Sequence, residues 1–233
     1  MRNAIKLYSW NRKLIVINDG NLSQNTHYSQ FGQDSFVLNE IFKGKHGGTF
    51  VDIGANHPTE SNNTYLLELN GWNGIAIEPQ QKLRDLWTNA RKTPCIGIVA
   101  GPENKEILFI EGTPEEHGLS GVQGFNKCHN DGKLVTVDQR RLDDILNEHG
   151  LKKIDYLSID VEGYEMNVLK GLDFSKVDIS VIGLENDLGF KNIPFFGARL
   201  GKELGNNEIR SFLKKNNYTY FARVMCDDFF IKK

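Results

Sequence analysis

The feature that most constrains the fold of this chain is a short apolar run that breaks at its end into a loop with an acid and a glycine. The run 49–53 carries Asp52 as its fourth residue and leads into Gly54. Such a run is typical of a buried parallel strand that ends in a tight loop. A second apolar run, 74–77, ends in Glu78. Ligands of open α/β sheets bind outside the carboxyl ends of the strands, so the two segments predict a ligand site.

The residues of this predicted site indicate a nucleoside cofactor. Gly54 has no Cβ, which lets the backbone approach a ligand, and Glu78 can accept hydrogen bonds from both hydroxyls of a ribose. A dinucleotide loop needs three glycines spaced G-x-G-x-x-G, and only one is present here. The carboxylate of Asp52 would repel a pyrophosphate but suits a cofactor with a positive end, such as S-adenosylmethionine. The alternative is any α/β protein in which an Asp closes a strand.

The composition bounds the class of protein. The chain has 233 residues, of which 39% are hydrophobic and 25% charged, which fits one large globular domain or a domain with an extension. A net charge of −2 gives no electrostatic case for a nucleic-acid partner or an anionic membrane. Three widely spaced cysteines without a C-x-x-C pair argue against zinc and favour a cytoplasmic location. No apolar run approaches the roughly 20 residues of a membrane span.

Strands and helices alternate along most of the sequence. Residues 1–27 form an accessory segment, with a strand at 13–17 and a turn at 18–21, and residues 28–233 form the main domain. Two short strands near the carboxyl terminus, within 219–231, predict an antiparallel hairpin. The fold class is therefore α/β, with a mainly parallel, doubly wound, Rossmann-like sheet. Further strands are expected at 95–99, 106–110, 133–137, 154–159 and 179–184, and helices at 33–42, 62–70, 80–90, 142–148, 164–169 and 206–216.

Four of the predicted strands end in an acid, and the carboxyl ends of parallel strands share one edge of a sheet. Besides Asp52 and Glu78, these acids are Asp160 and Glu185, and Asn186 follows directly. Oxygen ligands from two strand ends suit a hard divalent cation such as Mg²⁺, which would lower the pKa of a substrate hydroxyl. The alternative is that these acids cap helices or pair with lysines.

A general base is the other candidate for activating a hydroxyl. Asp160 or Glu162 can accept its proton through a hydrogen bond. His57 lies three residues after Gly54 and is a further candidate, although a loop histidine is more often only solvated.

Several segments, in this order, resemble the FkbM family of methyltransferases. The resemblance extends over about residues 28–233, and the first 27 residues fall outside it. The segments are 29–34 (SQFGQD), 50–55 (FVDIGA), 61–64 (SNNT), 71–74 (GWNG), 77–79 (IEP) and 157–165 (LSIDVEGYE), together with the later Glu185.

The resemblance implies a class I methyltransferase fold, S-adenosylmethionine as the methyl donor, and O-methylation of a sugar hydroxyl in a glycan or glycosylated metabolite. It also implies that 52–56 cradle the methionine part, Glu78 holds the ribose, 98–100 flank the adenine and 30–34 fold over the cofactor. Asp160 with Glu185 and Asn186 is similar by position to the metal site of catechol-type O-methyltransferases. The cofactor-binding candidates are Gln30, Asp34, Asp52, Ile53, Gly54, Ala55, Asn56, Ser61, Glu78, Pro79, Ile98, Val99 and Asp160.

Three other functions stay open from the sequence. A non-catalytic nucleoside-binding or assembly protein would keep the fold and lose methyl transfer. A nucleotide-dependent oxidoreductase is disfavoured by the missing glycines, and a nucleic-acid methyltransferase by the net charge.

Overall fold

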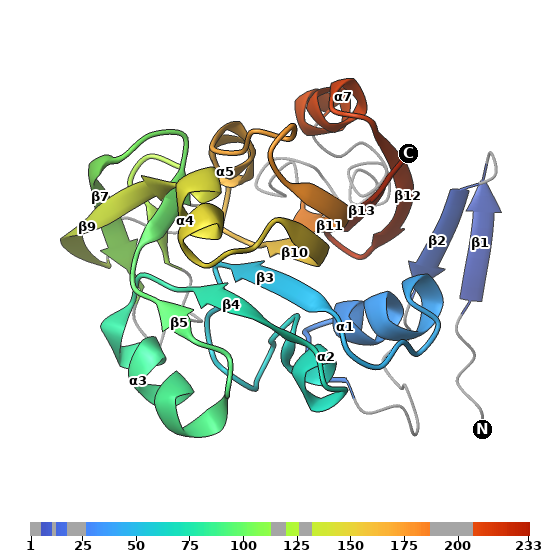
Figure 1. Cartoon of the computed structure of the whole chain (residues 1–233), viewed down its shortest axis with the longest axis horizontal. Helices are drawn as coiled ribbons and strands as arrows, with labels where there is room; N and C mark the ends of the chain where they lie inside the picture. The colour runs from blue at the N-terminus through green and yellow to red at the C-terminus, as the bar shows by residue number, and fades with distance from the viewer. Residues whose placement is uncertain (1–5, 11–12, 18–26, 113–119, 126–131, 187–206) are drawn as a thin grey trace, which may run out of the picture.

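Two β-sheets and the helices around the larger one make up the described part of the chain (Figure 1). The computed structural model describes residues 6–10, 13–17, 27–112, 120–125, 132–186 and 207–233. Within these residues the fold is α/β, as the alternation of the sequence predicts. No helix in these ranges is long and apolar enough to cross a membrane.

Five parallel strands form the centre of the larger sheet, and neighbouring strands in it are joined through helices. Their burial is nearly continuous, because helices cover both faces of the sheet. The run at 49–53 forms a strand with the predicted bounds. In spatial order the strands are β5 (Cys95–Ile96), β4 (Asn73–Ile77), β3 (Thr49–Ile53), β10 (Lys153–Ile159) and β11 (Asp178–Glu185).

Side chains that alternate along the strands pack in hydrophobic clusters on opposite faces of the sheet. In β3, Val51 and Ile53 pack in a cluster with residues of the helices on one face, whereas Phe50 packs in a cluster on the other. The first face is covered by α4 (Leu142–Glu148), α5 (Glu165–Lys170) and α7 (Asn207–Lys215). The second is covered by α1 (Gln33–Ser35), the π-helix η1 (Phe36–Ile41), α2 (Tyr65–Leu69) and α3 (Gln81–Ala90) (Figure 1).

Two of the predicted helices differ from the observed ones. The expected helix at 33–42 is one α-helical turn that continues as η1. The expected helix at 62–70 is confined to α2, since the Asn62 Oδ1 atom accepts the N–H groups of Thr64 and Tyr65 and thereby fixes the turn before it. Asn and Thr side chains commonly bind backbone in this way at helix starts.

Antiparallel strands complete the larger sheet beyond β11. β13 (Asp227–Lys232) pairs with β11 and with β12 (Tyr218–Val224), and β12 pairs in parallel with β2 (Lys13–Ile17). The strand expected at 13–17 is therefore present, and it also pairs in antiparallel fashion with the preceding β1 (Lys6–Trp10). The predicted turn at 18–21 lies outside the described residues.

The second sheet corrects the prediction of one strand at 95–99. The chain turns sharply after Ile96, where the Ile98 N–H donates to the Ile96 carbonyl, and only Cys95–Ile96 stays in the larger sheet. The chain then enters a four-stranded sheet that the alternation pattern did not predict as a separate unit. Its strands are β6 (Val99–Gly101), β9 (Lys133–Arg141), β7 (Lys105–Glu111) and β8 (Gly121–Val122).

The contact between β3 and β4 yields a test of the fold. A Cβ at Gly74 would lie 2.0 Å from the Phe50 carbonyl oxygen, which no flexible side chain can relieve. We expect Gly74→Ala to lower the free energy of unfolding by about 2–3 kcal/mol through overpacking, measured by urea denaturation. Asn73→Ala, at the exposed neighbouring position, is the control and should change it by less than about 0.5 kcal/mol. Equal stability of the two variants would contradict the observed packing.

Candidate functional site

A pocket of about 210 Å³ lies at the carboxyl ends of β3, β4 and β10. This is the edge where ligands of open α/β sheets bind. Twelve of the thirteen predicted cofactor-binding residues line it, and Asp34 does not. The residues that line it are Gln30, Asp52, Ile53, Gly54, Ala55, Asn56, Ser61, Asn63, Ile77, Glu78, Pro79, Gln80, Ile98, Val99, Ala100, Phe109, Ser120, Gly121, Val122, Asp160, Val161, Glu162 and Tyr164.

Gly54 joins the three strand ends at this pocket. Its N–H donates to the Ile77 carbonyl of β4, and its φ of +76° is a left-handed conformation that favours glycine. A Cβ at this position would lie 1.8 Å from the Asp160 carbonyl oxygen at the end of β10. The glycine is therefore required by the neighbouring strand end, in addition to leaving the backbone open toward the pocket.

Glu78 is a buried carboxylate held at the end of β4. Its Oε2 atom accepts the Asn56 N–H at 3.0 Å, and its Oε1 atom accepts the Gln80 N–H at 2.9 Å. Burial raises its pKa to about 6, although these hydrogen bonds act in the opposite direction. The acid thus links the loop after β3 to the start of α3 and presents negative charge to the pocket.

Asp52 lies below the loop, on the face of the sheet that also carries Phe50, because side chains alternate along β3. Its Oδ2 atom accepts the Thr64 hydroxyl at 2.7 Å. Burial raises its pKa, and hydrogen bonding and the positive charge of Arg91 lower it again.

One wall of the pocket is apolar and comes from two sheets. Ile98 and Val99 supply the side near β5 and β6, and Phe109 and Val122 come from β7 and β8 of the second sheet. The sequence pattern does not single out Phe109 or Val122. It does predict a long loop at 111–132, because that segment is rich in Gly, Pro, His and Asn, and it predicts substrate contacts there and at 188–206. The structure describes 111–112, 120–125 and 132 of the first segment, whereas 188–206 lies outside the described residues.

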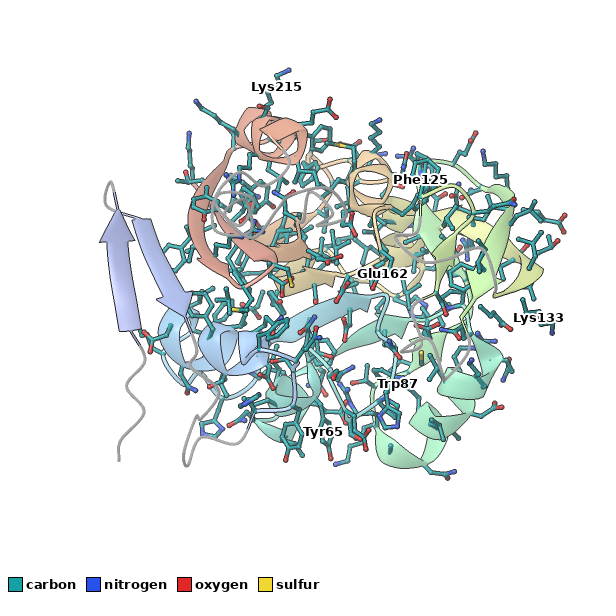
Figure 2. The ribbon with its side chains drawn as sticks, turned by 180° about the vertical axis from the view of Figure 1, so that it is seen from behind. Tyr65, Trp87, Phe125, Lys133, Glu162 and Lys215 are labelled. Carbon is teal, nitrogen blue, oxygen red and sulfur yellow. The ribbon has the colours of Figure 1, made fainter. Side chains whose placement is uncertain are left out.

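Three acids form a cluster at the pocket, of which Asp160 and Glu162 line it and Glu185 does not. Asp160, Glu162 and Glu185 each offer a carboxylate oxygen, and these atoms lie within 4.8 Å of one another. Glu162 reaches the cluster from a turn in which it and Gly163 both have positive φ, 53° and 100°, and Figure 2 labels it. Burial raises the pKa of Asp160 well above its usual range, and the neighbouring charge of Glu185 raises it further.

Asn186, which the sequence predicted as a metal ligand beside Glu185, points into a different network. Its Nδ2 atom donates to Asp228 Oδ2 at 2.7 Å, and its backbone N–H donates to the Cys226 carbonyl. Asp228 is fully buried and is also paired with Arg210 and Arg223. Glu162 joins Asp160 and Glu185 in the acid cluster, and the metal role of Asn186 stays a prediction.

Asp227 is a further acid near the cluster that the sequence analysis missed. It lies directly opposite Glu185 in the antiparallel pair of β13 with β11. Burial raises its pKa to about 7, with a further contribution from Glu185. In the sequence, Asp227 could have been found as one of two consecutive acids, Asp227 and Asp228, at the turn of the predicted C-terminal hairpin.

Two other predicted residues have local structural partners. Asp34 is completely buried and accepts hydrogen bonds from the Ser29 hydroxyl and the Tyr28 backbone, so it fixes the turn that carries Gln30 to the pocket. The Nδ1 atom of His57 accepts the N–H groups of Thr59 and Glu60, and His57 does not line the pocket. The cofactor role of Asp34 and the catalytic role of His57 stay predictions that this geometry does not support.

A pocket at this sheet edge, with an acid at the end of the second strand, is typical of proteins that bind a nucleoside cofactor. The chain matches the Methyltransferase FkbM domain over residues 52–220, which is more than half of its length. It therefore belongs to this family of methyltransferases, and the resemblance seen in the sequence is confirmed.

Two curated relatives that the chain matches are also named methyltransferases. Methyltransferase sdnD of Sordaria araneosa is 35% identical over 80 residues, and Methyltransferase 1 of Beauveria bassiana (strain ARSEF 2860) is 50% identical over 79 residues. These alignments cover 31% and 34% of this chain. The chain spans about a third of the length of the curated relatives it matches, 29% and 32%.

The raised pKa of Glu78 predicts a pH-dependent stability. A folded pKa of about 6, above the ordinary 4.5, means that the folded state binds this proton more tightly than the unfolded state. The contribution of the group favours folding below about pH 4.5 and is lost as the pH rises through 6. We expect the free energy of unfolding of the wild type, relative to Glu78→Gln, to fall by about 2 kcal/mol between pH 4.5 and 7. A difference that is constant with pH, in urea denaturation at both values, would disprove the assigned burial.

Proposed function

We propose that the protein is an S-adenosylmethionine-dependent O-methyltransferase. Membership of the FkbM family supports methyl transfer, and the donor and the oxygen acceptor are our assignment. The observation that carries it is the position of Glu78: a buried carboxylate at the end of β4, hydrogen-bonded to the loop after β3, in a pocket that Asp160 also lines.

The strand order supports a class I methyltransferase fold. The central parallel strands run β5-β4-β3-β10-β11, and the antiparallel β13 inserts between β11 and β12. In this arrangement the first strand of the domain, β3, lies at the centre, and the order along the sheet reverses between β3 and its neighbour β10. Such switch points are where cofactors bind in doubly wound sheets.

The donor groups of the pocket fit this cofactor. The Glu78 carboxylate accepts two backbone N–H groups and a hydrogen bond from the Gln80 side chain, which leaves acceptor capacity for a ribose hydroxyl. Asp52 supplies negative charge for the positive end, and Ile98 and Phe109 offer an apolar wall for the adenine. Within the described residues, the buried Gln80 Oε1 atom has no hydrogen-bond partner, so a ligand donor at this position would satisfy it.

Methyl transfer from this donor requires two things of the protein, positioning of the acceptor and removal of a proton. When bound, S-adenosylmethionine supplies a methyl group already activated by its sulfonium. Transfer of this methyl group to a hydroxyl oxygen would form a C–O bond as the S–CH₃ bond breaks, and would release S-adenosylhomocysteine and one proton, so the chain must position the acceptor and take that proton. The chain holds the acceptor in line, and Asp160, which lines the pocket, takes the hydroxyl proton, with Glu162 beside it.

A divalent cation such as Mg²⁺ is a second candidate for activating the hydroxyl. Asp160, Glu162 and Glu185 together offer only oxygen ligands, which Mg²⁺ prefers. They would hold the cation beside the acceptor hydroxyl and lower the pKa of that hydroxyl.

The acceptor we propose is a saccharide hydroxyl of a glycan or a glycosylated metabolite. Phe125, whose side chain is 48% exposed, packs edge-on against Tyr164, which lines the pocket (Figure 2). An exposed ring packed on a residue that lines the pocket offers a flat apolar surface for one face of a sugar. A cytoplasmic location and a main domain at 28–233 remain predictions from the sequence.

Cofactor binding is the first test. We expect isothermal titration calorimetry to show binding of S-adenosylmethionine and of S-adenosylhomocysteine to the wild type. Glu78→Ala should weaken both by at least about 100-fold, since two backbone N–H groups and the ribose lose their acceptor. The control Glu148→Ala removes an exposed carboxylate paired with Arg140 and should bind as the wild type does. Absence of binding to the wild type at millimolar ligand would reject the proposal.

Replacement of Asp160 tests the route of proton removal. We expect Asp160→Asn to retain S-adenosylhomocysteine binding and to lower kcat about 100-fold or more, measured as transfer of labelled methyl groups to a saccharide panel. Asp178→Asn, at the opposite end of β11, should leave kcat unchanged. Loss of activity in EDTA with recovery in Mg²⁺ would favour the metal, and full activity in EDTA would exclude it. Cofactor binding without transfer to any acceptor would favour a non-catalytic nucleoside-binding protein.

A further inference from the structure

Arg91, the residue directly after α3, is a buried cation below the pocket. Its side chain is fully buried, and its guanidinium lies 4.5 Å from the Trp87 ring centre and 5.1 Å from that of Tyr65. Figure 2 labels both rings, on α3 and α2. A charge buried among aromatic rings is stable only if its hydrogen-bond donors are paired. The groups that accept hydrogen bonds from Arg91 therefore show which part of the fold this buried charge stabilises.

The guanidinium donates to one acid and to three groups of the segment after β3. Its Nε atom donates to Glu68 Oε2 at 2.8 Å. Its Nη1 atom donates to the Pro58 carbonyl at 2.8 Å and to Asn62 Oδ1 at 3.1 Å. Its Nη2 atom donates to the Thr64 hydroxyl oxygen at 3.3 Å.

Asn62 carries this contact to the backbone of the pocket loop. Its Nδ2 group donates to the Ala55 carbonyl at 2.9 Å and to the His57 carbonyl at 3.1 Å. With the direct bond from Arg91 to Pro58, three carbonyl groups within 55–58 are held from below. Ala55 and Asn56, which line the pocket, lie in this stretch.

Thr64 carries the contact to the acid of the pocket. A hydroxyl has one proton, and the Thr64 oxygen also accepts a hydrogen bond from Arg91. Two acceptors lie within reach of the proton, Asp52 Oδ2 at 2.7 Å and Asn62 Oδ1 at 3.2 Å. The carboxylate of Asp52 is the nearer of the two and carries the negative charge, so the hydroxyl donates to it more strongly. Arg91 thus reaches Asp52 through one intermediate side chain.

We propose that Arg91 is a positioning residue for the donor site, which fixes the Asp52 carboxylate and the 55–58 backbone in the arrangement that the cofactor meets. This inference rests on the proposed function for the identity of the cofactor. Arg91 does not line the pocket, so its effect is transmitted through Thr64 and Asn62. Lysine cannot reproduce the effect, because its single ammonium cannot span Glu68, Pro58 and Thr64 as the planar guanidinium does.

The experiment compares Arg91→Lys with Thr64→Val and with a matched control. Thr64→Val keeps the shape of the side chain and removes only the hydroxyl that joins Arg91 to Asp52. The control, Arg223→Lys, makes the same change at an equally buried arginine that is paired with Asp228. All are studied as the full chain, at a temperature where circular dichroism shows them folded.

Two readouts separate positioning from general stability. The first is amide hydrogen exchange at 54–56 in the cofactor-free protein, where the N–H groups bond to Ile77 and Glu78. The second is the calorimetric Kd for S-adenosylmethionine, which carries the positive sulfonium, and for S-adenosylhomocysteine, which does not. We expect Arg91→Lys to speed exchange and raise both Kd values by about tenfold. Thr64→Val should raise the Kd of the positively charged donor more than that of the product.

Each outcome bears on the proposal. Wild-type exchange and affinity in both Arg91→Lys and Thr64→Val would overturn it, as would equal losses in Arg223→Lys. If Arg91→Lys does not fold, Thr64→Val alone decides, because it preserves the volume of the core. If the wild type binds neither ligand, the proposed function fails, whereas the exchange at 54–56 still tests the positioning role of Arg91.

Discussion

The structure depends most on the close approach of three strand ends at Gly54. Its amide donates to β4, the Asp160 amide of β10 donates back to Ile53, and the absence of a Cβ lets the Asp160 carbonyl lie against its α-carbon. Any larger residue would separate β3 from β10. Because Asp52, Glu78 and Asp160 are attached to these three ends, the distances between them follow from this single contact. The pairing of the strands therefore fixes the positions of the acids in the pocket.

Local sequence patterns were sufficient to predict the strands and helices that form this edge of the sheet. The apolar run at 49–53 and the helix at 142–148 have the predicted bounds, since each is specified by its own periodicity. The second sheet was not predictable in the same way. β6 pairs with β9 about forty residues later, and such long-range pairing leaves no local signal. The split of the run 95–99 follows from that pairing, because Val99 belongs to the second sheet and Cys95 to the first.

The candidate site was predictable where it consists of strand ends. Acids that follow parallel strands must share an edge, so placing Glu78 near Asp160 needed only the order of the strands. The roles of Asn186 and Glu162 could not be separated from the sequence. Asn186 turns to Asp228, a partner from a strand forty residues later, and Glu162 turns to the pocket through a backbone conformation with positive φ. Neither side-chain direction is encoded in the spacing.

The apolar wall that β7 and β8 contribute to the pocket ties the shape of the pocket to the stability of the fold. The acids and the Gly54 contact belong to the large sheet. Phe109 and Val122 belong to the small sheet, yet they are buried in the same hydrophobic cluster as Val51 and Ile53 of β3. Side-chain packing therefore holds the small sheet against the large one. A smaller side chain at Phe109 or Val122 would enlarge the pocket and also leave a cavity in the core, so ligand fit and stability cannot be changed independently there.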